Sequence, residues 1–181
     1  YDGTPLVNET VTITTGSVAE GQNAELYTTG TITDVGSAEN TYFLRITDAE
    51  GNDVTDNYAV TDSIGKLTVT SRQIVVSTPS ATKVYDGTPL ADPRYSIVSD
   101  ITVAEGHTVT EATLLASVTD VGDATNEFTS FIITDATGND VTANYSIEFA
   151  CGTLTVTPRE ITIRTEDAAK IYDGTPLVNE T

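Results

Sequence analysis

Two acidic loops carry residues whose types and spacing would suit a metal ion. The loop DAEGND contains Asp48 and Asp53, and the loop DATGND contains Asp135 and Asp140, each with an asparagine just before its second aspartate. Carboxylate and amide oxygens are the ligands that Ca²⁺ takes in proteins, so one interpretation is a calcium site at these loops. The spacing does not match an EF-hand loop, and the other interpretation is a hairpin turn with its glycine at positive φ.

Lys83 and Asn144 are a second set with chemical potential. Lys83 precedes the tyrosine of a YDG motif by two residues, in an early strand, and Asn144 begins a late strand of the same repeat. In a β-sandwich such a pair, with an acidic neighbour, can condense to an isopeptide bond with loss of one ammonia, which would lock the first and last strands. The alternative is a lysine whose stem covers apolar surface while its ammonium meets carboxylates.

No other residues suggest catalysis. His107 aligns with Gln22 of the other repeat, so we expect an exposed residue at a strand start rather than a general base. Cys151 aligns with Ile64, which predicts a buried, inert thiol. The sequence contains no nucleophile elbow, phosphate-binding glycine loop or paired metal-ligand motif. We therefore predict that the chain is not an enzyme and, apart from the calcium alternative, takes no cofactor.

These residues sit in a repeated unit. Residues 1–10 reappear unchanged as residues 172–181, and their first six letters, YDGTPL, also stand at residues 85–90. The strings VAEG, TDVG, GNDVT-x-NY and G-x-LTVT follow in the same order in both copies. We therefore expect two modules of about 85 residues, which is the size of a small domain, and the start of a third.

The module boundaries follow from the alignment of the copies. Module 1 comprises residues 1–70 and is expected to lack its first strands, module 2 comprises residues 71–157, and residues 158–181 would be the first strands of a third module. The closing decapeptide matches the opening one better than the middle one, which indicates a period of 171 residues in a longer array. The closing segment should then either dock on module 1 of a neighbouring copy, head to tail, or extend with no sandwich around it.

The amino-acid composition limits the classes of partner that the chain can bind. Eight Lys and Arg against 27 Asp and Glu give a formal charge of −19, which disfavours nucleic acid and anionic membrane surfaces. No apolar run is long enough to span a bilayer, so we expect no direct membrane insertion in this segment. One cysteine excludes a disulfide framework and leaves the compartment open.

Thr, Val, Ile and Tyr recur with period two, the pattern of half-buried strands, and helical periodicity is nearly absent. Expected strands of module 2 span residues 72–77, 81–85, 95–99, 107–118, 126–134, 144–149 and 152–157, and residues 159–164 should start the next module. About seven short strands per module predict immunoglobulin-like β-sandwiches. The alternative, a β-grasp-like module, would need a helix. Because only two residues separate the last strand of one module from the first of the next, we expect tandem modules in an extended rod.

The ordered strings K-x-YDGTPL, TDVG, GNDVT-x-NY and G-x-LTVT-x-R-x-I resemble the MBG/YDG-type repeat domains of bacterial surface proteins over essentially the whole chain. The resemblance implies an extracellular location, at the cell surface or cell wall, within a large adhesin-like protein, and no enzymatic activity. We expect a structural stalk that projects a distal functional domain and whose partners are neighbouring repeats. The alternative is a binding module whose loops or tyrosines recognise a host glycan, mucin or other host protein.

Overall fold

The computed structural model describes residues 1–114 and 117–178, and it is an all-β structure of several small sheets. Module 1 contains β1 (Asn23–Thr28), β2 (Gly36–Asn40), β3 (Tyr42–Thr47), the 3-10 turn η1 (Thr55–Asn57) and β4 (Gly65–Val69). Module 2 contains β5 (Arg72–Ser77), β6 (Ala81–Val84), β7 (Ser96–Ile97), β8 (Thr108–Leu114), β9 (Gly122–Thr125), β10 (Phe128–Thr134), η2 (Thr142–Asn144), β11 (Tyr145–Ala150) and β12 (Thr153–Thr157). The described residues contain no α-helix, as the β-grasp alternative would require, and none of their helical turns is long and apolar enough to cross a membrane.

Alternating side chains explain the strands. In β5, Ile74 and Val76 are fully buried, while Gln73, the residue just before Ile74, is exposed. In β12, Leu154 and Val156 are buried and alternate with threonines. Burying one such aliphatic side chain is worth about 1.5–3 kcal/mol, and β-branched residues fit the pleated surface on which they stand. Each strand is therefore held chiefly by the face that it turns to the core.

Two long parallel pairings organise module 2. β11 runs parallel to β5 from the pair Tyr145–Arg72, and β12 runs parallel to β6 from the pair Leu154–Ala81. Both pairings keep the same offset along the chain, 145 − 72 = 73 and 154 − 81 = 73. The segments 72–84 and 145–157 therefore lie side by side along the module, and they pass together from the sheet β11-β5-β7 to the sheet β6-β12-β9.

The core of module 2 lies between the sheet β11-β5-β7 and the antiparallel pair β8-β10. Its buried members are Ile74, Val76, Ile133 and Tyr145. In module 1, by contrast, the buried apolar side chains are Ile46 and Leu67. Its strands form two separate two-stranded sheets, β1-β3 and β2-β4, which leaves module 1 much less completely packed.

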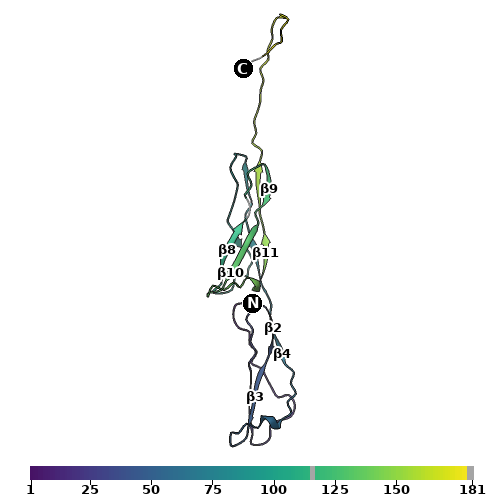
Figure 1. Cartoon of the computed structure of the whole chain (residues 1–181), viewed down its shortest axis with the longest axis vertical. Helices are drawn as coiled ribbons and strands as arrows, with labels where there is room; N and C mark the ends of the chain where they lie inside the picture. The colour runs from purple at the N-terminus through teal and green to yellow at the C-terminus, as the bar shows by residue number, and fades with distance from the viewer. Residues whose placement is uncertain (115–116, 179–181) are drawn as a thin grey trace.

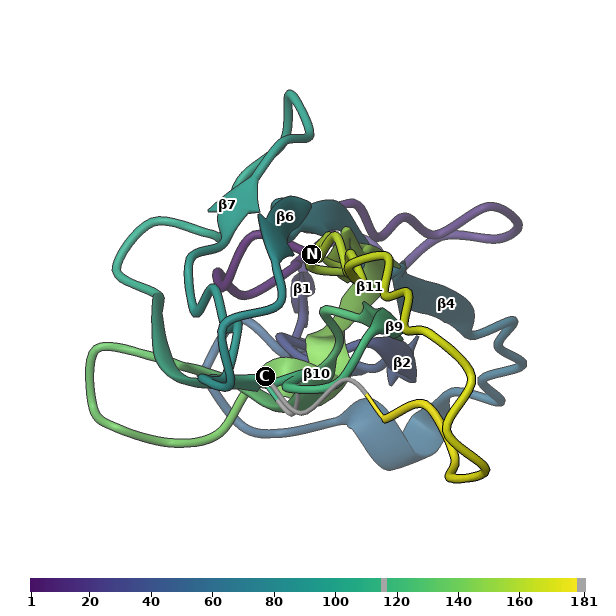
Figure 2. The same cartoon turned by 90° about the horizontal axis from the view of Figure 1, so that it is seen from above.

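The two modules follow one another along the longest axis of the molecule, and the chain beyond module 2 extends away from both of them and then turns back (Figure 1). The N-terminus lies between the modules (Figure 1). Viewed along that axis, β7 and the loop beyond it project sideways from the other strands (Figure 2). Residues 158–178 form no strand, and residues 179–181 of the expected third module lie outside the described part.

Most of the strands expected for module 2 are present, with three differences. The strand expected at residues 107–118 is β8, which ends at Leu114, and residues 115–116 lie outside the described residues. No strand was expected between residues 118 and 126, yet β9 (Gly122–Thr125) lies there, because it pairs with β12. The strand predicted at residues 159–164 is absent, since that segment has no neighbouring strand to pair with in the described chain.

Candidate functional site

The acidic loops are turns that hydrogen-bond to themselves. Asp48 Oδ1 accepts from the backbone N–H groups of Glu50 (3.1 Å) and Asn52 (2.8 Å), and its Oδ2 accepts from the Asn52 side chain (3.0 Å). These hydrogen bonds, the Asn52 side chain first, hold the pKa of Asp48 below its usual value. Gly51, at φ +85°, supplies the positive φ of the hairpin interpretation.

The second loop repeats this arrangement. Asp135 Oδ1 accepts from Thr137 (backbone N and Oγ1, both 2.8 Å) and from the Asn139 backbone N–H (2.9 Å), while Oδ2 accepts from Asn139 Nδ2 (3.0 Å). The Thr137 hydroxyl, followed by Asn139, keeps the pKa of Asp135 well below its usual range. The glycine of this loop, Gly138, again has positive φ, at +88°.

Asp53 and Asp140 accept hydrogen bonds from the threonine that begins each 3-10 turn, and they do not join these loops in a shared cluster. Asp53 Oδ1 accepts from Thr55 (2.7 and 3.0 Å), and its Oδ2 accepts from Arg45 Nε (3.3 Å). Asp140 Oδ1 accepts from the Thr142 backbone N–H (2.9 Å). Hydrogen bonds, first from the side chains of Thr55 and Thr142, lower the pKa of these two aspartates. Within residues 1–114 and 117–178, no three His, Cys, Asp or Glu side chains are grouped to hold a metal ion, and a calcium site stays a prediction.

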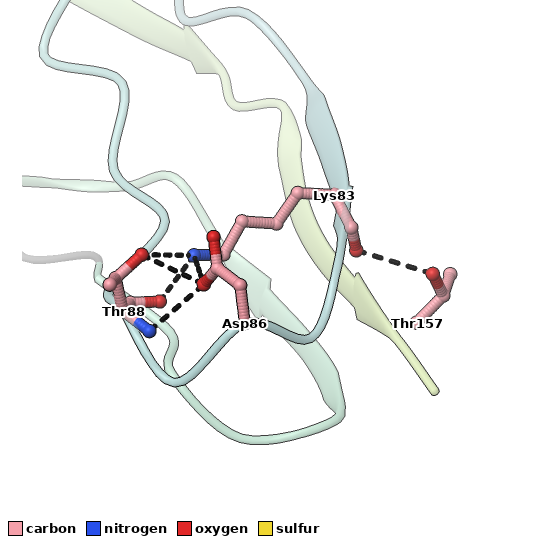
Figure 3. Close-up of polar contacts among 4 residues, drawn as sticks. All are labelled: Lys83, Asp86, Thr88 and Thr157. Carbon is pink, nitrogen blue, oxygen red and sulfur yellow. Dashed lines mark hydrogen bonds and ion pairs between the residues drawn. The ribbon is translucent and has the colours of Figure 1, made fainter. Parts of the chain in front are cut away.

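Lys83 closes the YDGTP turn (Figure 3). Its Nζ donates to Asp86 Oδ1 (2.7 Å), to Thr88 Oγ1 (2.9 Å) and to the Thr88 carbonyl, and Asp86 Oδ1 also accepts from the Thr88 backbone N–H (2.9 Å). Lys83 is the largest cause that lowers the pKa of Asp86 far below its usual value. Lys170 makes the same ion pair with Asp173, at 2.8 Å. The ammonium thus meets a carboxylate of its own turn.

Asn144 lies at the opposite end of module 2 and faces module 1. Its Nδ2 donates to Asp34 Oδ1 (2.8 Å), and its Oδ1 accepts from the Val35 backbone N–H (2.7 Å). The parallel ladder starts beside Asn144, at the pair Tyr145–Arg72, and ends beyond Lys83, at the pair Thr157–Val84. The structure therefore does not bring Lys83 and Asn144 together, as the expected isopeptide bond would require.

Asn144 belongs to an interface between the two modules. Arg72 bridges it, since Nη1 donates to the Tyr1 carbonyl of module 1 (3.2 Å) and Nε donates to the Thr102 carbonyl of module 2 (2.6 Å). The Tyr1 and Tyr145 rings meet edge to face with centroids 5.7 Å apart, and Tyr1 also lies 5.8 Å from the His107 ring. Burial, together with the charges of Tyr145 and Asp34, raises the pKa of the Tyr1 hydroxyl. The contacts fix the two modules relative to each other through polar and aromatic groups.

His107 is a half-buried structural residue and not the exposed one that we expected. Its Nδ1 is hydrogen-bonded to the Tyr145 hydroxyl (2.8 Å), which also accepts from the Ala104 backbone N–H (2.9 Å). Module 1 repeats the arrangement with Tyr58 and Gln22, at 2.5 Å. This pairing was not predicted, although both copies have a tyrosine after GNDVT-x-N and a polar residue after VAEG.

Cys151 is half-buried rather than buried, and it is a free thiol. Its counterpart Ile64 is exposed. An open groove at the module interface is lined by Asp2, Gly3, Thr4, Arg72, Ala104 and Glu105. These lining residues supply carboxylates and a guanidinium, which can bind polar groups.

An unpaired sheet edge is the remaining feature, and it belongs to module 1. β4 pairs with β2 on one side, and on its other side the only backbone bond among the described residues runs from the Tyr1 amino group to the Thr70 carbonyl (2.8 Å). In module 2 the equivalent bond, from the Tyr85 N–H to the Thr157 carbonyl (2.8 Å), continues the β6-β12 pairing. Unpaired edges of this kind are templates for another strand.

Comparison with models of known protein families, with curated proteins and with solved structures found no match. The likeness to YDG-type repeats therefore stays a prediction from the sequence.

Proposed function

We propose that this chain is a structural, non-enzymatic stalk segment of a large bacterial surface protein, and that it holds a distal functional domain away from the cell. The observation that carries the proposal is the junction between the modules. β4 ends at Val69 and β5 begins at Arg72, so two residues connect the modules, and contacts on both sides fix them. A connection so short leaves little room for one module to swing on the other.

The interface supports stiffness in a second way. Asn144 is buried and satisfied by two groups of module 1, and Arg72 holds carbonyls of both modules. Separating the modules would leave these polar groups without their partners, at a cost of about 1–3 kcal/mol for each group that water does not reach. Nearest-neighbour contacts of this kind give repeat arrays their extended, semi-rigid form, and we propose immunoglobulin-like modules stacked as a rod.

Charge and the resemblance complete the proposal. The net charge of −19 keeps such a rod soluble and extended through self-repulsion. The extracellular, wall-attached location and the adhesin-like parent protein rest on the likeness to YDG-type repeats. The partners of each module are then its neighbours in the array.

Small-angle X-ray scattering tests the proposal. A chain with two consecutive copies of the 171-residue period should have about twice the maximum dimension of one copy, because stacked repeats add length linearly. A matched chain with a six-residue Gly-Ser insertion between Thr70 and Ser71 should show a broader distribution of shorter dimensions. A doubled chain whose maximum dimension grows much less than twofold would contradict a stalk.

An aromatic cluster favours a second candidate function, the binding of a host glycan or protein. Tyr95 and Phe149 are exposed at its rim, and Phe128 lies 4.9 Å from Phe149 and 5.9 Å from Tyr95, between ring centroids. The residue of module 1 that aligns with Phe149 is Asp62, so the cluster is not a requirement of the repeat. Exposed apolar patches often mark binding sites. A glycan and mucin array probed with the wild-type chain and a Phe149→Asp variant decides between the two functions, since a spacer binds nothing in either form.

A further inference from the structure

In module 2, the segment 72–84 completes two sheets at once. β5 is the central strand of β11-β5-β7, and β6 covers one side of β12 in β6-β12-β9. Ile74 and Val76 of β5 are 1% and 0% exposed, and they form the centre of the module's core. Module 2 therefore depends on this one segment for two of its three sheets and for the centre of its core.

Module 1 lacks a strand in the equivalent place. The counterparts of β11 and β7 are residues 58–63 and 12–13, and neither segment is a strand in the described chain. Val60 is 52% exposed and Ile13 is 49% exposed, whereas their counterparts Ile147 and Ile97 pack on the core of module 2. Both segments flank the position of the missing central strand, which accounts for their irregular backbone.

The chain carries a segment that fits this place. Residues 159–171 align with residues 72–84 and repeat their arginine, alternating aliphatic residues and lysine. Ile161 and Ile163, the counterparts of Ile74 and Val76, are 79% and 83% exposed on the extended tail. Apolar side chains that are spaced for one face of a strand but exposed to water are characteristic of a strand-forming segment that has no sheet to pair with.

We propose that residues 159–171 are the strand that completes a module 1 outside their own period, and that in the 181-residue chain by itself they reach this place only on a second copy, so that copies of this chain join head to tail. The register is that of module 2, which places Ile161 beside Val60 and Ala168 beside Leu67, as Ile74 lies beside Ile147 and Ala81 beside Leu154. The docked segment runs parallel to residues 58–70. The inference does not depend on the stalk function, since it requires only these two surfaces.

Specific contacts also form where the β5–β11 pairing ends and the β6–β12 pairing begins. In module 2, Thr78 Oγ1 donates to the Asn126 carbonyl (2.6 Å) and accepts from the Gly152 N–H (2.9 Å). A Cβ on Gly152 would lie 2.4 Å from the carbonyl carbon of Pro79, so the two segments approach closely there. The counterparts are Thr165 in the tail and Gly65 in module 1, and Gly65 at present has room for a Cβ, with Asn40 Cβ at 3.8 Å.

Residues at the outer ends of the two modules correspond to those that meet at the interface within one chain. Asn57 of module 1 is the exposed counterpart of the buried Asn144, and Asp120 and Val121 of module 2 are the exposed counterparts of its partners Asp34 and Val35. When the tail docks, module 2 of the donor copy is brought to this end of module 1 of the acceptor, as module 1 meets module 2 within one chain.

Charge favours the same pairing. Residues 159–171 hold three of the eight basic side chains and three acidic ones, so this segment is neutral while the whole chain carries −19. The docking segment thus approaches an acidic module without adding to its repulsion. Salt should strengthen the association, because it screens the repulsion between the two acidic bodies.

Sedimentation velocity of the complete 181-residue chain over a concentration series tests the proposal. We expect dimers and longer species that increase with concentration and with salt. In the monomer the side chain of Ile163 is in water, so Ile163→Lys leaves the fold intact, but on docking it would bury an ammonium in the core position of Val76. We expect this variant to weaken association by at least about tenfold.

Two further chains make the test specific. Thr162→Lys adds the same charge on the opposite face of the strand and should associate nearly as well as the wild type. Gly65→Ala leaves the monomer unstrained but places a methyl where the donor backbone must pass, so it should abolish association. A synthetic peptide of residues 159–171 should cap module 1 and inhibit assembly, whereas a scrambled peptide should not.

A chain that stays monomeric at all concentrations and salt conditions would overturn the proposal. Association that survives both Ile163→Lys and Gly65→Ala would also overturn it, because another surface would then join the copies. Equal loss in Thr162→Lys and Ile163→Lys would show that charge alone matters, and it would count against strand docking.

Discussion

Lys83, Asp86 and Thr88 form a turn that is closed by their own hydrogen bonds. The Lys83 ammonium is the largest cause of the lowered pKa of Asp86. We predict that Lys83→Met raises the pKa of Asp86 towards its ordinary value, since the charged form loses its strongest partner. The pKa is measured by NMR titration of the Asp86 carboxyl carbon. Lys66→Met on β4 is the control, and a similar rise in both variants would mean that the general loss of positive charge, and not this contact, is the cause.

Gly152 and Gly65 are equivalent in sequence but not in surroundings. A Cβ on Gly152 would lie within 2.6 Å of backbone atoms of Pro79 and Ser80, and a Cβ on Gly65 would meet nothing closer than 3.8 Å. We predict that Gly152→Ala lowers the free energy of unfolding of module 2 by about 1–3 kcal/mol, the usual cost of an overpacked core. Gly65→Ala should cost much less in the monomer. Urea unfolding of both variants at low concentration measures the difference, and equal losses would contradict it.

Strand formation depends on partners as much as on sequence. The segments 72–77 and 159–164 have the same alternating pattern, which predicts a strand in both, yet only the first is one, because only the first has β11 and β7 beside it. β9, with the sequence GDAT, has the composition of a turn and is nevertheless a strand, because it pairs with β12. Local pattern therefore predicted the aliphatic strands and the turns, but could not predict which edges would be filled.

The same limit applies to the candidate site. The hairpin at residues 48–53 was predictable because Asp, Gly and Asn act locally through hydrogen bonds to their own backbone. The separation of Lys83 from Asn144 was not, because it follows from the parallel pairing of segments 73 residues apart. Spacing along the chain contains no information on which end of a module a residue reaches.

The acidic turns predict how stability depends on pH. In the folded protein the aspartates of these turns have a pKa below the usual value of an aspartate. The same holds for Asp92, whose pKa is lowered to about 2 by Arg94. An unfolded chain therefore binds protons more readily, so this stabilisation is present above about pH 4 and is lost as the pH falls towards 2. Above pH 4, falling pH instead reduces the self-repulsion of the net charge of −19. The unfolding temperature should be highest near about pH 4–5.

Asp135→Asn is the matched variant for this prediction, because it removes one titrating group and keeps the shape. Scanning calorimetry between about pH 2 and pH 7 should show a lower unfolding temperature for the variant at neutral pH and a smaller fall below about pH 4. An unfolding temperature that keeps rising as the pH falls from about 4 to 2 would contradict the prediction.

At the scale of the whole molecule, the repeat unit and the structural unit are out of phase. Residues 159–171 belong to one period by sequence, but by structure they match the strands that complete the module after them. Each junction in an array would then be made of shared strands rather than of a linker. Such an arrangement converts every module boundary into a stretch of continuous sheet, which suits a stalk that carries tension.

Hydrogen exchange on a chain of two consecutive 171-residue periods tests this most directly. In that chain the first tail can complete the second copy of module 1, while the first copy of module 1 and the second tail have no partner. Measured by mass spectrometry at low concentration, peptides covering residues 58–64 and 159–171 should each show two equal populations, one protected and one exchanging fast. A single fast-exchanging population in both peptides would contradict the account, because the internal copies would then be as open as the terminal ones.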